Sequence, residues 1–196
     1  MQYYIYSLVC FLLPGTVWLI WNKGMIADKA YKTRHIIWIY IYMFYGYLAV
    51  QEAAGIGTIW DLITYGKLDN SINLIPFSSE GAMTYILNII MFMPLGFLLP
   101  LIWKNFRNAK KVVLMGFLMS LAIEICQLFN LRATDIDDLM MNTLGALVGY
   151  CCWKVFSLIF RNAGTKCVEM KKSEPVIYMF GGILGLFLLY NWRVFN

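Results

Sequence analysis

The sequence has little charge for its length. Asp, Glu, Lys and Arg make up 14% of its 196 residues, whereas soluble domains contain about 25%. Hydrophobic residues make up 61%, more than a soluble domain of this size can bury. Intrinsic disorder requires a more polar chain, and a secreted disulfide scaffold requires more cysteine. The composition therefore predicts a polytopic membrane protein.

The sequence is also poor in residues that bind zinc. It has one histidine, five cysteines and no CxxC motif, which argues against a zinc site with the usual ligands. His35 stands at the inner boundary of a predicted span, and we expect its ring to extend toward the membrane surface. No predicted outer loop contains cysteine, so no disulfide is expected.

Six apolar segments are long enough, or nearly so, to cross a bilayer. Each is apolar on all sides, as helices packed among lipid and other helices should be. The last segment is short and rich in glycine, and without it the count falls to five. The fold class is therefore an all-α transmembrane bundle of about six spans, namely residues 3–21, 36–54, 84–103, 112–129, 139–160 and 176–192.

Basic residues set the orientation, because Lys and Arg near span ends favour the cytoplasmic side. Thirteen of the 16 follow the first, third and fifth predicted spans. Both termini are then outside, and most carboxylates lie on the outer side. We divide the chain into a first helix and loop (1–34), a core (35–160), and a loop with a last helix (161–196). No soluble basic module is present, so no nucleic-acid partner is expected.

Polar side chains of three predicted spans lie at one depth. At about 1.5 Å rise per residue, Asn88, Glu124, Gln127 and Asn142 are about 3–8 Å below the outer boundary. Polar groups are costly inside a bilayer, so this coincidence predicts a functional pocket.

A short connection between the fourth and fifth spans closes over this layer and contains Arg132. Asp135, Asp138 and Asn142 follow at a helical spacing that places them on one face. The structural alternative is that Glu124 pairs with Arg132, that Asp135 caps a helix, and that the two asparagines hydrogen-bond across helices.

The long outer connection, 55–83, is apolar for a loop. Residues 56–65 predict a short interfacial helix. Residues 72–77 contain Asn73 and Pro76, and form either a lid over the pocket or an interfacial anchor. Pro94 and Gly96 are expected to kink the third span, and Gly145 and Gly149 to permit close helix contact.

These segments resemble the VanZ-like family of bacterial membrane proteins. The resemblance covers roughly residues 35–160 and implies a plasma-membrane protein of a Gram-positive bacterium. The family is named for a determinant of resistance to the glycopeptide antibiotic teicoplanin. The stretches that carry the resemblance are NLIPF (73–77), Asn88 with FMPLG (92–96), EICQ (124–127), Arg132, Asp135, Asp138 and NTLGALVG (142–149).

Three functions remain open. The first is binding of a lipid-linked wall precursor, a lipid headgroup or the glycopeptide in the outward-facing pocket. The second is an enzyme acting on a lipid-linked substrate, with Glu124 as base, Arg132 and Asp138 as further catalytic groups, and Mg²⁺ or Ca²⁺ held by Asp135 and Asp138. The third is a transporter, ranked last because no inner polar cluster is evident. The candidate binding residues are Asn73, Asn88, Glu124, Gln127, Arg132, Asp135, Asp138 and Asn142.

Overall fold

A computed structural model describes residues 2–22, 24, 29–67, 72–77, 81–130, 134–160 and 171–195. It confirms the all-α fold. A π-helical segment, Leu48–Ala54, prolongs the second helix. The helices are α1 (Gln2–Asn22), α2 (Lys29–Tyr47), α3 (Ile59–Tyr65), α4 (Ala82–Ile102), α5 (Ala109–Gln127), α6 (Ile136–Ile159) and α7 (Glu174–Leu189).

Two very short strands join distant parts of the chain. The strand β1 (Ile72–Asn73) pairs in parallel with β2 (Thr134–Asp135), with Ile72 opposite Thr134 and Asn73 opposite Asp135. The pairing fastens the long connection after α3 to the start of α6. The sequence does not show this pairing, because two residues are too few for a strand pattern.

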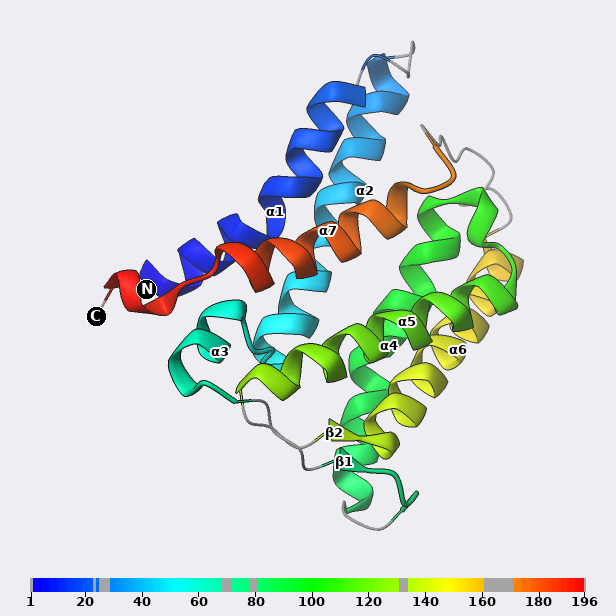
Figure 1. Ribbon diagram of the computed structural model, residues 1–196. Helices are drawn as coiled ribbons and strands as arrows, with labels where there is room; N and C mark the ends of the chain where they lie inside the picture. Colours follow the sequence, from blue (N-terminus) through cyan, green and yellow to red (C-terminus); the bar gives the residue numbers. More distant parts are fainter. Residues whose placement is uncertain are drawn as a thin grey trace.

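The helices run between two opposite ends of the molecule (Figure 1). One end, here called the terminal end, carries both chain termini, α3, β1 and β2. At the other, the basic end, α1, α4 and α6 finish and α2, α5 and α7 begin. The described basic residues of the basic end are Lys32, Arg34, Lys104, Arg107, Lys110, Lys111, Lys154, Lys171 and Lys172.

Among the described residues, four helices are long and apolar enough to cross a membrane. They are α1, α4, α6, and α5 together with the 3-10 turn Leu128–Asn130 that continues it. The helix α7 is apolar but has 16 residues, fewer than the roughly 20 that a span needs. The helix α2 begins with basic residues, which lowers its mean hydropathy. The six-span count and the outside location of the termini stay predictions.

The closest helix contact is between α4 and α6, which lie parallel. A Cβ built on Gly149 would be 2.0 Å from the Met93 carbonyl oxygen, and one on Gly96 would be 1.9 Å from that of Ala146. Only glycine permits this approach of two helix backbones. The contact fixes the register in which the first turns of α4 and α6 meet at the terminal end.

The short helix α3 begins with a capping box. The Thr58 backbone N–H donates to the Asp61 carboxylate at 2.6 Å, and the Thr58 hydroxyl donates to the same oxygen at 2.9 Å. The indole of Trp60 donates to the Leu188 carbonyl at 3.2 Å, which ties α3 to the end of α7. The short helix predicted within 56–65 is present as Ile59–Tyr65, and its location at the membrane interface stays a prediction.

Candidate functional site

Polar side chains from β1, β2, α4, α5 and α6 meet at the terminal end, around the first turns of α4 and α6 and the last turns of α5. We call this group the terminal-end cluster. Its members are Asn73, Tyr85, Asn88, Ser120, Glu124, Asp135, Asp137, Asp138 and Asn142.

The start of α6 supplies three carboxylates of the cluster. Asp135 is the N-cap residue, and its side chain accepts from the Asp137 backbone N–H at 2.9 Å. Asp137 and Asp138 lie in the first turn, where the helix dipole stabilises negative charge. The predicted capping role of Asp135 thus coexists with a place in the cluster.

Asp135 also connects β1 to α5. Its carboxylate accepts from the Asn73 side-chain amide at 3.0 Å, and its backbone N–H donates to the Glu124 carboxylate at 3.3 Å. Glu124 is buried on the last turns of α5. One residue therefore joins the long outer connection, α5 and α6, and its contacts bring together three of the candidate binding residues, Asn73, Glu124 and Asp135.

Asp137 is fully buried and holds the segment 72–77 in place. Both its carboxylate oxygens accept from the Phe77 backbone N–H, at 2.8 and 3.0 Å, and one also accepts from the Tyr85 hydroxyl at 2.8 Å. Among the described non-glycine residues, only Phe77 has a positive φ, 61°. That backbone conformation costs an aromatic residue about 1–3 kcal/mol. The hydrogen bonds from the Phe77 N–H to Asp137 therefore stabilise a strained turn.

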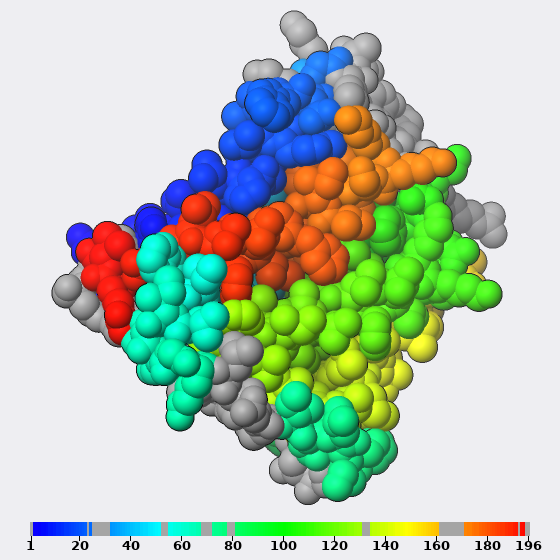
Figure 2. Space-filling view, in the orientation of Figure 1, coloured from blue at the N-terminus to red at the C-terminus, as the bar shows by residue number. Residues whose placement is uncertain are grey.

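The segment 72–77, which we call the tip, exposes large apolar side chains although its backbone is anchored. Leu74 and Ile75 are each 68% exposed and Phe77 is 64% exposed. Figure 2 shows the tip in blue-green at the lower edge of the molecule. Three large apolar side chains are therefore exposed next to a cluster in which Asp138 is half-buried and the other carboxylates are buried.

Two amide contacts lie deeper between the helices. The Asn88 amide of α4 donates to the half-buried Asp138 carboxylate, and the Asn142 amide of α6 donates to the Ser120 hydroxyl at 3.0 Å. Asn142 is buried, and its side-chain oxygen has no hydrogen-bond partner within the described part of the chain. A buried acceptor of this kind can take a hydrogen bond from a ligand or a water molecule.

The remaining predicted site residues lie outside the terminal-end cluster or outside the described residues. Gln127 is buried on the last turn of α5, and Pro76 is in the tip. Pro94 lies within α4, which runs without a break, and Gly96, Gly145 and Gly149 lie where α4 packs on α6. Arg132 is outside the described residues, so its predicted pairing with Glu124 stays a prediction.

Asp135 and Asp138, the predicted metal ligands, both accept hydrogen bonds from amide groups. Within the described ranges no three His, Cys, Asp or Glu side chains are grouped as metal ligands. The arrangement therefore adds no support to the Mg²⁺ or Ca²⁺ hypothesis.

Three members of the cluster are absent from the sequence-based candidates: Tyr85, Ser120 and Asp137. Helical spacing could have found two of them, since Tyr85 precedes Asn88 by three positions and Ser120 precedes Glu124 by four. Asp137 has no such signal, because its main partner is a backbone N–H 60 residues away.

A second polar cluster is buried at the basic end, and the sequence does not predict it. The His35 ring contacts both oxygens of Glu174 at 3.2 Å, and Glu174 is fully buried. The Trp103 indole donates to Glu174 at 3.0 Å and the Tyr178 hydroxyl at 3.3 Å. We call these four residues the basic-end cluster. The expectation that His35 extends to the membrane surface is wrong, because the ring pairs with the first residue of α7.

Comparison with known proteins shows which parts of the chain a known family shares. The sequence profile of the VanZ/LLP1 family matches residues 35–158. The chain belongs to the VanZ/LLP1 family. It is also 36% identical to "Protein VanZ" of Enterococcus faecium over 134 residues, which are 67% of this chain and 77% of that protein. No solved structure matches it significantly.

The region that matches the VanZ/LLP1 profile runs from early α2 to the end of α6. It contains every residue of the terminal-end cluster. It contains His35 and Trp103 of the basic-end cluster, but not Glu174 or Tyr178 of α7. The family resemblance therefore rests on the part of the chain that builds the terminal-end cluster and the tip.

Proposed function

We propose that this VanZ-like membrane protein lowers the susceptibility of the cell to glycopeptide antibiotics of the teicoplanin type. In this proposal the terminal-end cluster faces the outside and binds the polar head of an envelope amphiphile. The candidate ligands are a lipid-linked wall precursor, a lipid headgroup or the drug itself. Family membership supports the cellular role, and the geometry of the cluster supports the binding step.

The observation that carries the proposal is the anchored but exposed tip. A loop that served only to connect α3 with α4 would need neither a buried carboxylate to hold it nor a positive φ at Phe77. The fold instead stabilises a turn that presents Leu74 and Ile75 outward beside polar groups. An amphiphile at the outer leaflet offers a polar head to the cluster and an apolar part to the tip.

The charges of the cluster favour a head rich in hydrogen-bond donors. The described acidic side chains here are the carboxylates of Glu124, Asp135, Asp137 and Asp138, and among the described residues the Asn142 side-chain oxygen has no hydrogen-bond partner. Amino, amide and hydroxyl groups complement such a surface. Arg132, if it lies at the mouth, would add a partner for phosphate or carboxylate.

The hydrogen bonds that the Asp135 and Asp137 carboxylates accept within the protein favour binding over catalysis. Asp137 accepts from the Phe77 backbone and from Tyr85, and Asp135 accepts from Asn73 and from its own helix. Groups fixed in this way position a surface and are less available to transfer protons. The enzyme hypothesis instead requires Glu124 to act as a base.

The variant Asp138→Asn tests the proposal without removing the acceptor that Asn88 uses. Loss of one charged hydrogen bond to a ligand weakens binding about tenfold or more. We expect resistance to teicoplanin to fall in a susceptible host while the amount of protein in the membrane stays constant. The matched control is Glu174→Gln, which changes a buried carboxylate of the basic-end cluster.

Wild-type resistance in Asp138→Asn at normal abundance would contradict the proposal. Purified protein in vesicles then separates the ligands in three arms: labelled lipid-linked precursor, precursor-free phospholipid, and teicoplanin. Saturable binding in one arm that Asp138→Asn weakens identifies the ligand. Release of a changed product in the first arm would favour the enzyme hypothesis over simple binding.

A further inference from the structure

An apolar groove of about 500 Å³ runs along α6 from the terminal-end cluster. Among its α6 residues, Ile136, Met140, Thr143 and Leu147 recur every three or four positions and form one stripe of the helix, and the other lining residues of α6 flank this stripe. The groove begins at Ile136, the first residue of α6, which lies between the cluster residues Asp135 and Asp137. Its lining residues are Val113, Phe117, Ile136, Leu139, Met140, Met141, Thr143, Leu144 and Leu147.

The antiparallel packing of α5 on α6 places the two α5 residues of the lining at the deep part of the groove. Asn142 contacts Ser120, and a Cβ on Gly116 would be 2.5 Å from that of Ala146. Phe117 is therefore opposite the middle of α6. The groove thus has a polar mouth at the start of α6 and an apolar far end.

The length of the groove matches one leaflet of a bilayer. From Ile136 to Leu147 the helix rises about 16 Å, and half of the hydrocarbon core is about 15 Å thick. Because α5 and α6 are both candidate spans, the groove opens toward hydrocarbon. Only an apolar chain is stable along such a surface.

We infer that the α5–α6 groove holds a hydrocarbon chain of the amphiphile whose head binds the terminal-end cluster. The inference rests on the proposed function and deepens it, because it assigns the ligand to the lipids and excludes a water-soluble ligand. The head lies at the half-buried Asp138, next to the buried Asp135 and Asn142, and the chain follows α6 toward Leu147.

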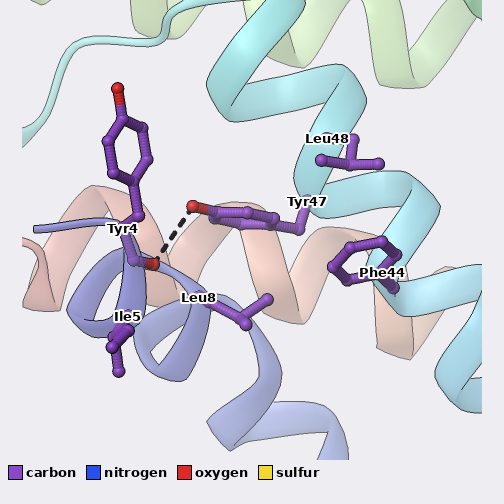
Figure 3. A pocket seen from close by; sticks show the side chains of 6 residues that line it. All are labelled: Tyr4, Ile5, Leu8, Phe44, Tyr47 and Leu48. Carbon is purple, nitrogen blue, oxygen red and sulfur yellow. Dashed lines mark hydrogen bonds between the residues drawn. The ribbon is translucent and has the colours of Figure 1, made fainter. Parts of the chain in front are cut away.

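A second groove provides a comparison within the same molecule. It lies between α1 and α2, has a volume of about 450 Å³, and is lined by Tyr4, Ile5, Leu8, Phe44, Tyr47 and Leu48 (Figure 3). The Tyr47 hydroxyl donates to the Tyr4 carbonyl at 3.2 Å beside it. None of its residues belongs to the terminal-end cluster, so we expect no head-specific lipid there.

The test replaces one leucine by tryptophan in each groove and one on α5 outside both grooves. The three leucines have nearly equal exposed fractions. Leu144 in the α5–α6 groove is 42% exposed, Leu48 in the α1–α2 groove is 41% exposed, and Leu118 on α5 outside both grooves is 40% exposed. Each full-length variant is purified in detergent, and native mass spectrometry measures the lipid that stays bound. The mass of the released lipid identifies its head.

We expect wild type, Leu48→Trp and Leu118→Trp to retain one lipid, and Leu144→Trp to retain about tenfold less, because overpacking an apolar site is costly. Leu147→Trp repeats the test if Leu144→Trp does not reach the membrane. Equal retention in all variants overturns the groove assignment, whatever the resistance phenotype. Loss of lipid in Leu144→Trp with unchanged teicoplanin resistance also overturns the inference, since the lipid would not be the ligand of the cluster.

The proposed function fails independently if Asp138→Asn keeps wild-type resistance, whatever lipid the Leu144→Trp variant retains. A retained lipid that Asp138→Asn releases, together with loss of resistance in Leu144→Trp, supports head and chain binding by one ligand. Retention of ordinary phospholipid only, unaffected by Asp138→Asn, counts against the link between groove and cluster.

Discussion

The two polar clusters of the protein differ in what surrounds them. At the basic end, Glu174 is sealed among His35, Trp103 and Tyr178, with no described member of the cluster exposed. At the terminal end, carboxylates of graded burial hold a tip whose apolar side chains are exposed. Both clusters place ionisable side chains inside a largely apolar bundle, but only the second lies beside exposed apolar side chains.

The two clusters therefore differ in their surroundings, and the proposed recognition role falls to the terminal-end cluster. The buried contact between His35 and Glu174, with the hydrogen bonds from Trp103 and Tyr178, fixes the start of α7 against α2 and the end of α4. The terminal-end cluster instead fixes the backbone of the tip, and the apolar side chains of the tip stay exposed. Polar residues inside a membrane protein therefore need not mark a site, and exposure of their neighbours is the criterion that distinguishes the two cases.

The largest effect is expected from Glu174→Ala. The change leaves the Trp103 indole, the Tyr178 hydroxyl and the His35 ring buried without their acceptor. Breaking a buried pair by removing one partner costs about 3–5 kcal/mol, so the variant should unfold at much lower temperature and reach the membrane in smaller amounts.

Thermal unfolding of the purified protein measures this loss. Glu174→Gln serves as its control, because it keeps an oxygen acceptor for Trp103 and should lose less stability. Unchanged melting of Glu174→Ala would show that the basic-end cluster does not hold α7 in place.

A smaller effect is expected from Asp137→Ala. Hydrogen bonds to a charged group contribute about 1.5–3 kcal/mol, and here they fix the Phe77 backbone. The loss should be local: the Phe77 amide should exchange hydrogen faster and the tip should become sensitive to proteases, while the α4–α6 contact persists.

Hydrogen exchange followed residue by residue distinguishes this outcome from global unfolding. Protection of the Phe77 amide at the wild-type level would contradict the anchoring role of Asp137. Reduced teicoplanin resistance should accompany the loosened tip.

The smallest effect is expected from Tyr85→Phe. It removes one of the donors to Asp137 and leaves the Phe77 N–H in place, so stability should fall by about 1.5 kcal/mol, the low end of the range for one hydrogen bond to a charged group. Chemical denaturation of wild type and variant in the same micelle measures the difference. A loss as large as that of Asp137→Ala would mean that Tyr85, and not the Phe77 backbone, carries the anchor.

Much of the fold can be predicted from the sequence because apolar helices have a strong periodic and compositional signal. The predicted segment 84–103 is α4, Ala82–Ile102, and 139–160 is α6, Ile136–Ile159. The shared depth of Asn88, Glu124 and Asn142 also follows from counting residues along helices, and the structure brings their three helices together at the terminal end.

The rest depends on partners that leave no local pattern. Asp137 binds a backbone N–H, which any residue at position 77 would supply. Glu174 follows Lys171 and Lys172, and such a charged stretch predicts a solvated loop although its last member is buried. The buried position of His35 has no local signal for the same reason, because its partner Glu174 is 139 positions away in the sequence.

The most direct test of the central claim is resistance per molecule of folded protein for one variant from each cluster. Teicoplanin susceptibility is measured for Asp138→Asn and Glu174→Gln at expression levels adjusted to equal amounts of folded protein in the membrane. The account predicts that Glu174→Gln then matches wild type and that Asp138→Asn does not protect the cell. Equal protection by both variants, or loss of protection in Glu174→Gln alone, would contradict it.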